Sequence, residues 1–233
     1  TASQDRPELI ARIRQGLMLS TASMLPLAAL FLALATPIVA LVYERGAFNQ
    51  GAVELVTGLL MAYGLGMPAY LGRDVLVRVF YALGDGTTPF RLSVIGIGLN
   101  VVFDWALVGG PTPWGPQLPF NFGAAGLVLA TVLINVLTCV ALLLALQHRL
   151  KVLPLKQWGT DGLRLMVAAV GAGIVAWGLS EGVRWPVDLV GRLLQVGLSG
   201  SLGGLVFMAL GQAFDVQEVR EISKGLTRRL TRR

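Results

Sequence analysis

Charged residues are scarce in this sequence. Asp, Glu, Lys and Arg make up 14% of the 233 residues, whereas hydrophobic residues make up 55% and the mean hydropathy is +0.69. A soluble domain of ordinary composition carries roughly 25% charged residues. The low charge therefore excludes an ordinary soluble domain and indicates a membrane protein.

Cysteine and histidine are almost absent. The chain has one cysteine, Cys139, and one histidine, His148. A single cysteine cannot form an internal disulfide, and these two residues offer no His/Cys metal cluster. One histidine in a basic segment also gives no convincing Ser-His-Asp arrangement, and no Walker-type phosphate loop is present. We therefore predict no enzyme, no cofactor and no metal site.

Apolar blocks of helix length run through the chain, separated by short punctuated loops. About 20 apolar residues in a helix cross a hydrocarbon core of about 30 Å. We predict an all-α polytopic membrane protein with about six transmembrane helices. The blocks are Leu17–Tyr43, Ala52–Leu83, Pro89–Val108, Phe122–Leu146, Leu163–Leu179 and Val190–Phe214.

Positive charge is concentrated at both ends of the chain and in one internal loop. Lys and Arg are retained on the cytoplasmic side of a membrane. The segment Gln147–Gly162 contains three of them, whereas Gly109–Asn121 contains none. We predict that both ends of the chain are cytoplasmic and that Gly109–Asn121 is external.

The last residues, 215–233, place apolar side chains close to one helical face and basic side chains on much of the rest. Such a segment is typical of a helix on the anionic inner leaflet. We predict a cytoplasmic tail that contacts anionic membrane lipids through Arg220, Lys224, Arg228 and Arg229. Nothing else in the chain supports nucleic-acid binding, so none is expected.

Three charges lie in the second half of the second block: Arg73, Asp74 and Arg78. Charged residues inside a span usually face the bundle interior or a hydrated cavity. One interpretation is a cationic lining for a phosphate-bearing substrate, with Asp74 paired to Arg78 at i, i+4. The other is that the helix emerges into the cytoplasm here, where the charges are solvated or paired.

Three polar residues within other blocks also have two interpretations. Asp104 could couple transport to protons or sodium, or it could be solvated or bonded to a neighbouring helix. Asn100 and Asn135 could hydrogen-bond between helices, contacts worth about 0.6 kcal/mol on average in membranes, or they could bind substrate.

Three stretches in this order resemble segments of the MurJ/MviN lipid II flippases: 43–48, 78–89 and 121–127. The residues that carry most of this resemblance are Glu44, Arg45, Gly46, Phe48, Phe80, Tyr81, Asp85, Thr88 and Pro89. The six predicted spans are similar to the last six of the fourteen in that family. The resemblance covers essentially the whole chain.

The resemblance implies a fold and a function. The chain would be the C-terminal part of a longer flippase of the bacterial inner membrane that moves the undecaprenyl-linked peptidoglycan precursor by alternating access. Cell-wall synthesis proteins are a further candidate partner. The expected regions are a lead-in at residues 1–16, four second-lobe helices at 17–150, two additional helices at 151–214 and the tail at 215–233. The family's central cavity residues lie chiefly in helices upstream of this chain.

Two alternatives remain open. A polysaccharide-lipid flippase or multidrug antiporter of the same superfamily would share the fold, although the segments at 45–48 and 80–82 argue against both. A membrane scaffold that recruits cell-wall enzymes through its basic tail would need no transport, but the sequence has no large soluble domain.

Overall fold

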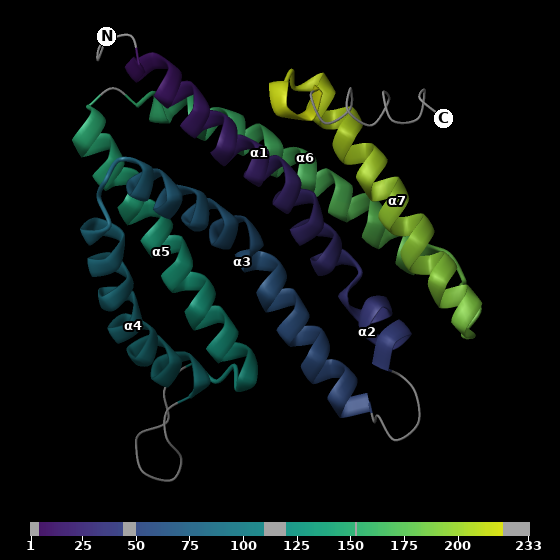
Figure 1. Ribbon diagram of the computed structural model, residues 1–233. Coiled ribbons are helices and arrows are strands. Elements are labelled where there is room, and N and C mark those ends of the chain that lie inside the picture. The colour runs from purple at the N-terminus through teal and green to yellow at the C-terminus, as the bar shows by residue number, and fades with distance from the viewer. Residues whose placement is uncertain (1–4, 44–49, 110–119, 152, 221–233) are drawn as a thin grey trace. The chain divides into compact units, whose positions relative to one another are not determined.

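The computed structural model describes residues 5–43, 50–109, 120–151 and 153–220, and its regular structure there is helical (Figure 1). The helices are α1 (Asp5–Ala33), α2 (Ala35–Tyr43), α3 (Gln50–Ala82), α4 (Thr87–Val108), α5 (Ala124–Leu150), α6 (Leu155–Gly182) and α7 (Leu189–Ala213). All of these except α2 are long and apolar enough to cross a membrane. The prediction of six spans is confirmed at the level of length and composition.

The first span begins earlier than the apolar block and ends earlier too. We expected it over Leu17–Tyr43, but α1 runs from Asp5 to Ala33 and a break at Leu34 separates it from α2. Pro37 accounts for the break, because it has no N–H to donate to the Ala33 carbonyl and its ring crowds that turn. The helical bonds resume where Ile38 N–H donates to Leu34 O at 2.9 Å.

The basic loop expected over Gln147–Gly162 is much shorter. Helix α5 continues to Leu150 and α6 begins at Leu155. The polar residues on either side of the gap are therefore helical. The apolar blocks identified the part of each helix suited to lipid and missed the ends that project beyond it.

The chain forms two compact units. The first comprises residues Thr1–Val53 and Pro154–Arg233, and the second comprises Glu54–Leu153. The first unit therefore contains α1, α2, α6 and α7, while α4, α5 and nearly all of α3 belong to the second. The expected grouping of four plus two helices remains a prediction about the complete protein.

Small side chains on α6 bring the helices of the first unit together. Ala168, Ala169 and Ala172 are buried on α6, and they form a core cluster with Ala22 of α1 and Phe207 of α7. Small residues at helix interfaces let backbones approach closely in membranes. Leu165, Val216 and Val219 complete this cluster.

Two kinds of contact hold the helices of the second unit together: a close backbone approach and a small cluster of apolar side chains. Gly126 of α5 packs on the backbone of α4, where a Cβ would lie only 2.6 Å from the Leu107 carbonyl oxygen. Between α3 and α5, buried Ala62, Val128 and Val132 form a small apolar cluster. These contacts leave a polar region further along the same three helices.

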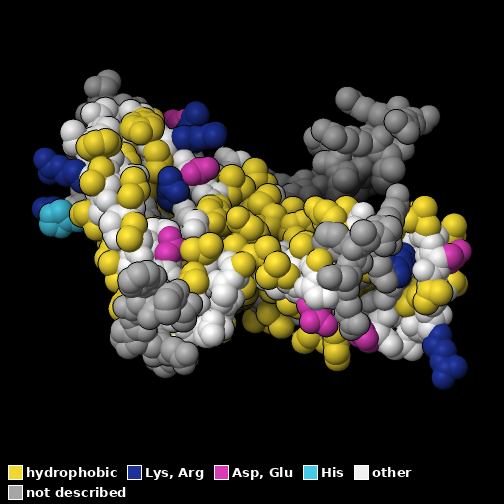
Figure 2. All heavy atoms as spheres, turned by 90° about the horizontal axis from the view of Figure 1, so that it is seen from below, with side chains coloured by type: hydrophobic (Ala, Val, Ile, Leu, Met, Phe, Trp, Pro, Cys, Tyr) yellow, Lys and Arg dark blue, Asp and Glu magenta, His cyan; other side chains and the backbone are white. Residues whose placement is uncertain are grey.

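Large apolar side chains also cover much of the molecular surface (Figure 2). On α4, for example, Phe90, Ile97 and Val101 are each at least 65% exposed. A monomeric soluble protein rarely exposes such extended apolar surface. Lipid or additional helices would cover it in a membrane.

Candidate functional site

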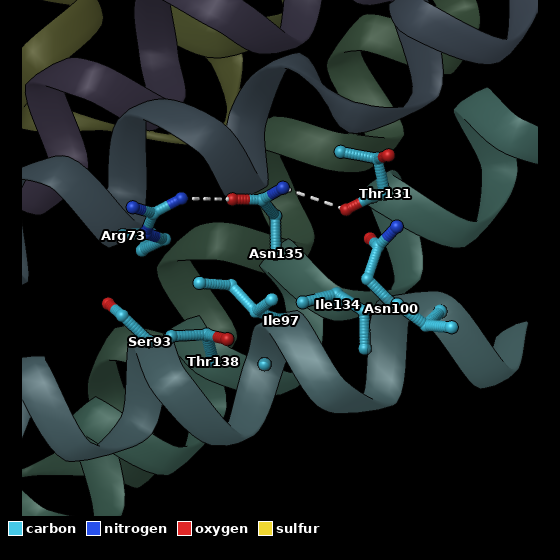
Figure 3. A pocket seen from close by; sticks show the side chains of 10 residues that line it. Arg73, Ser93, Ile97, Asn100, Thr131, Ile134, Asn135 and Thr138 are labelled. Atoms are coloured by element: carbon cyan, nitrogen blue, oxygen red, sulfur yellow. Dashed lines mark hydrogen bonds between the residues drawn. The ribbon is translucent and has the colours of Figure 1, made fainter. Parts of the chain in front are cut away.

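A cavity of about 400 Å³ lies among α3, α4 and α5, entirely within the second unit (Figure 3). Most of its wall is apolar, but polar side chains enter it from all three helices. The lining residues are Arg73, Ser93, Gly96, Ile97, Asn100, Val101, Thr131, Ile134, Asn135 and Thr138. The cavity is therefore a polar recess in an otherwise apolar bundle.

Arg73 is held by Asn135. Its Nη1 donates to Asn135 Oδ1 at 2.7 Å, and Asn135 Nδ2 donates to the Thr131 carbonyl oxygen at 2.7 Å. The second bond fixes the amide so that its oxygen faces the guanidinium (Figure 3). Asn135 is 4% exposed, which makes it a buried and fully oriented anchor.

Arg73 keeps unused donor capacity at the cavity. Its Nε is buried and has no hydrogen-bond partner, and no carboxylate among the described residues forms an ion pair with it. Arg73 lies nine residues before Ala82, the end of α3, or about 14 Å along the axis at 1.5 Å per residue. A bare Arg at the bilayer centre costs about 3 kcal/mol on the lenient scale. The cavity and Asn135 provide the polar surroundings that this charge needs.

The structure separates the three charges that the sequence grouped. Arg73 lines the cavity, whereas Asp74 and Arg78 are exposed and lie outside its lining. Across the residues the structure describes, no ion pair joins Asp74 to Arg78, although their spacing permits one. Only Arg73 is therefore placed at the cavity.

The other polar residues differ in whether they bond between helices or within one helix. Asn135 joins two helices, as its position in an apolar block suggested. Asn100 instead donates to Asp104 within α4, at 2.6 Å, and Asp104 Oδ1 is buried without a partner among the described residues. Sequence reasoning missed Ser93, Thr131 and Thr138, because small hydroxyl residues are common in membrane helices and carry no signal alone.

The segment from Phe80 to Pro89 builds the turn between α3 and α4. Asp85 accepts hydrogen bonds from Thr88 N–H at 3.0 Å and from Thr88 Oγ1 at 2.8 Å, and it pairs with Arg149 of α5 at 2.7 Å. The hydrogen bond from the Thr88 backbone N–H lowers the pKa of Asp85 most, followed by the bond from the Thr88 hydroxyl. The charge of Arg149 lowers it further, and the pKa falls to about 2. Phe80 is 1% exposed, whereas Tyr81 is exposed. This stretch has a local structural role, which ties the turn to the end of α5.

Several predicted residues lie outside the described ranges. They are Glu44, Arg45, Gly46, Phe48, Lys224, Arg228 and Arg229. Arg220 is described and forms an ion pair with Asp215.

A family model and several relatives point to the same family. The family model described as lipid II flippase MurJ matches residues 1–193. A probable lipid II flippase MurJ of Synechocystis sp. is 46% identical over 174 residues, covering 75% of this chain and 31% of that protein. One of Rhizobium tropici is 29% identical over 195 residues, covering 82% of this chain and 34% of that protein.

A solved structure of lipid II flippase MurJ in an inward closed conformation has the same fold. Its TM-score is 0.70 at 23% identity, and the match covers 91% of this chain and 40% of that chain. The chain spans about a third of the length of the curated relatives it matches.

Proposed function

The chain belongs to the lipid II flippase MurJ family, and from this premise we propose that it forms part of a lipid II flippase. The complete protein would move the undecaprenyl-linked peptidoglycan precursor across the bacterial inner membrane by alternating access. We also propose that the protein acts as a transporter and catalyses no chemical reaction. The family match and the six membrane-length helices support it.

The observation that carries the proposal at the level of residues is Arg73 at the polar cavity. A lipid-linked diphosphate presents phosphate oxygens, and a guanidinium matches phosphate geometry with two parallel N–H donors. Asn135 uses one donor nitrogen of Arg73 and fixes the plane of the group. Nε remains buried and unpartnered, so the site has donor capacity to offer an anion.

We also propose supporting roles for Arg78 and Asp74. Both are exposed on α3, between Arg73 and the C-terminal end of that helix. Arg78 would add positive potential on the approach to the cavity, and Asp74 would limit it. Their effect on transport should be smaller than that of Arg73, because solvent and salt screen exposed charges.

Orientation and partners complete the proposal. Both ends of the chain would be cytoplasmic, and the residues beyond Arg220 would contact anionic lipids. Cell-wall synthesis proteins that make or use the precursor are candidate partners.

The test is substitution of Arg73 in the full-length protein. Arg73→Ala should reduce the amount of lipid II that reaches the outer leaflet while expression is retained. Arg73→Lys should restore part of it, because an ammonium attracts phosphate but lacks the planar fork. Arg91→Ala is the matched control, since Arg91 is exposed on α4 and outside the cavity lining. Outer-leaflet lipid II is measured by its accessibility to an external lipid II-cleaving reagent.

Asn135→Asp separates charge from structure at the same site. This substitution keeps an acceptor for Arg73 but neutralises the guanidinium with a carboxylate. If Arg73 attracts phosphate, the Asn135→Asp variant should be folded and transport-deficient. Normal flipping by both Arg73→Ala and Asn135→Asp would mean that Arg73 is a structural charge.

A further inference from the structure

The segment after α7 folds back onto the first unit. The chain turns at Asp215, whose φ of 59° is left-handed, a conformation that Asp tolerates better than most residues. Val216 N–H then donates to the Gly211 carbonyl oxygen at 3.1 Å. The turn directs residues 216–220 back towards the helices from which the chain has just emerged.

Two valines of this segment are buried in the core of the first unit. Val216 is 3% exposed and Val219 is 0% exposed, and both belong to the cluster formed by α1, α6 and α7. The contact with α7 is close, because a Cβ on Gly211 would lie 2.7 Å from Val219 Cγ2. The apolar face that the sequence assigned to lipid is therefore covered by protein at these two positions.

A single arginine ties the same segment to two helices. Arg14 of α1 donates from Nη1 to Glu218 Oε1 at 2.9 Å and from Nη2 to Asp161 Oδ2 of α6 at 2.7 Å. The Glu218 side chain is only 4% exposed, and those of Arg14 and Asp161 are 28% and 21% exposed. Arg164 lies at 3.8 Å from the other oxygen of Asp161. One guanidinium thus bridges α1, α6 and the segment that follows α7.

We propose that residues 216–220 form an intramolecular clamp that locks the ends of α1, α6 and α7 into one rigid body. Val216 and Val219 fill the end of the apolar core, and Glu218 bound to Arg14 fixes the register of the segment. The membrane-surface tail then begins only beyond Arg220.

The physical reason for a clamp is the cost of a buried carboxylate. Removing one partner from a buried ion pair leaves an uncompensated charge, which destabilises strongly. Glu218 is therefore stable in its buried position only while Arg14 holds it, and Val216 and Val219 stay packed only while that segment is held. The ionic and apolar contacts support each other.

Two truncations of the full-length protein test where the clamp ends. Ending the chain after Arg220 should leave the melting temperature in detergent unchanged. Ending it after Phe214 should lower the melting temperature by several degrees, because it removes Val216, Glu218 and Val219 together. Equal melting temperatures for the two truncated proteins would overturn the proposal.

Point variants keep the test decisive if the shorter protein fails to fold. In Arg14→Gln and in Glu218→Gln, backbone amides of residues 216–220 should exchange hydrogen about tenfold faster or more, since local opening controls exchange. The double variant should exchange no faster than the more affected single variant, because both changes remove the same contact between Arg14 and Glu218. Arg12→Gln is the control, as Arg12 pairs with Glu8 in an exposed position. Unchanged exchange in both single variants, or fully additive effects, would contradict the clamp.

Discussion

Arg73 illustrates what a charged residue inside an apolar helix requires from its neighbours. Its position in the second half of a long apolar block identified it as unusual from the sequence alone. Its partner, Asn135, lies 62 residues away on another helix, and no local pattern links the two. The sequence could therefore predict that Arg73 has polar surroundings, but only the packing of α3 against α5 shows which group provides them.

The pair Asp74 and Arg78 shows the opposite limit of sequence reasoning. A spacing of four residues brings two side chains to one helix face, and it permits an ion pair without requiring one. Both side chains are exposed, where a pair contributes about 0–1 kcal/mol and costs side-chain entropy. Spacing alone therefore could not decide between pairing and solvation at these positions.

Asp85 gives a prediction about pH. Its pKa is lowered from 3.8 to about 2, first by the Thr88 backbone N–H. A carboxyl with a lowered folded-state pKa stabilises the fold above its unfolded pKa, and this contribution is lost as the pH falls through the folded value. We expect Asp85→Asn to lower the melting temperature by a constant amount between about pH 8 and pH 5, with the difference vanishing between about pH 4 and pH 2.

The control for this prediction is Asp74→Asn, since the Asp74 carboxyl is exposed and has no hydrogen-bond or ion-pair partner among the described residues. That variant should show no such dependence on pH. Thermal unfolding of the detergent-solubilised full-length protein provides the measurement. If the melting-temperature difference between the Asp85→Asn variant and the parent persisted unchanged at the lowest pH, the ionised Asp85 carboxylate would not be the source of the stabilisation.

At the scale of helices, hydropathy predicted the number of spans and not their ends. Apolar runs report the length of helix that suits lipid, whereas a helix continues for as long as its backbone bonds are satisfied. Helix α6 thus begins at Leu155, eight residues before its apolar block, and α1 begins at Asp5. To predict the break before α2, one would have to know that Pro37 interrupts its helix, whereas Pro26 and Pro68 lie inside continuous helices.

The close approach of α4 and α5 gives a prediction about packing. A methyl group at Gly126 would lie 2.6 Å from the Leu107 carbonyl oxygen and 2.7 Å from its carbon. Backbone atoms cannot yield as a flexible side chain can, so Gly126→Ala should force the helices apart. We expect a loss of about 1–3 kcal/mol in unfolding free energy, as for other overpacked interiors. Gly98→Ala is the matched control, because a Cβ there meets no atom within 4 Å.

Denaturant unfolding of the two full-length variants distinguishes these outcomes. The Gly98→Ala protein should match the parent or exceed it slightly, since alanine favours the helix over glycine. Equal stability of Gly126→Ala and Gly98→Ala would show that α4 and α5 are less tightly packed than the structure indicates.

At the scale of the whole molecule, the charge distribution predicts a topology that the helices themselves do not test. One set of helix ends adjoins the turn at 83–86, which joins α3 to α4, and the gap at 151–154, which joins α5 to α6. These ends carry Arg91, Arg149 and Lys156. The opposite ends of α4 and α5 meet the segment 109–121, which has no Lys or Arg. From the positive-inside rule we predict that the first set of ends is cytoplasmic and that the second is external.

Cysteine labelling tests this topology in the full-length protein. The native Cys139 lies within α5 and is first replaced by alanine so that it does not contribute signal. A cysteine at Thr112 should react with a membrane-impermeant maleimide added to right-side-out vesicles, and a cysteine at Gln157 should react only after permeabilisation. Gln157 is exposed next to the start of α6, so protection there reports the membrane and not burial in the protein. The reverse pattern would invert every span, and it would place the C-terminal end of α3, near Arg78, outside the cell.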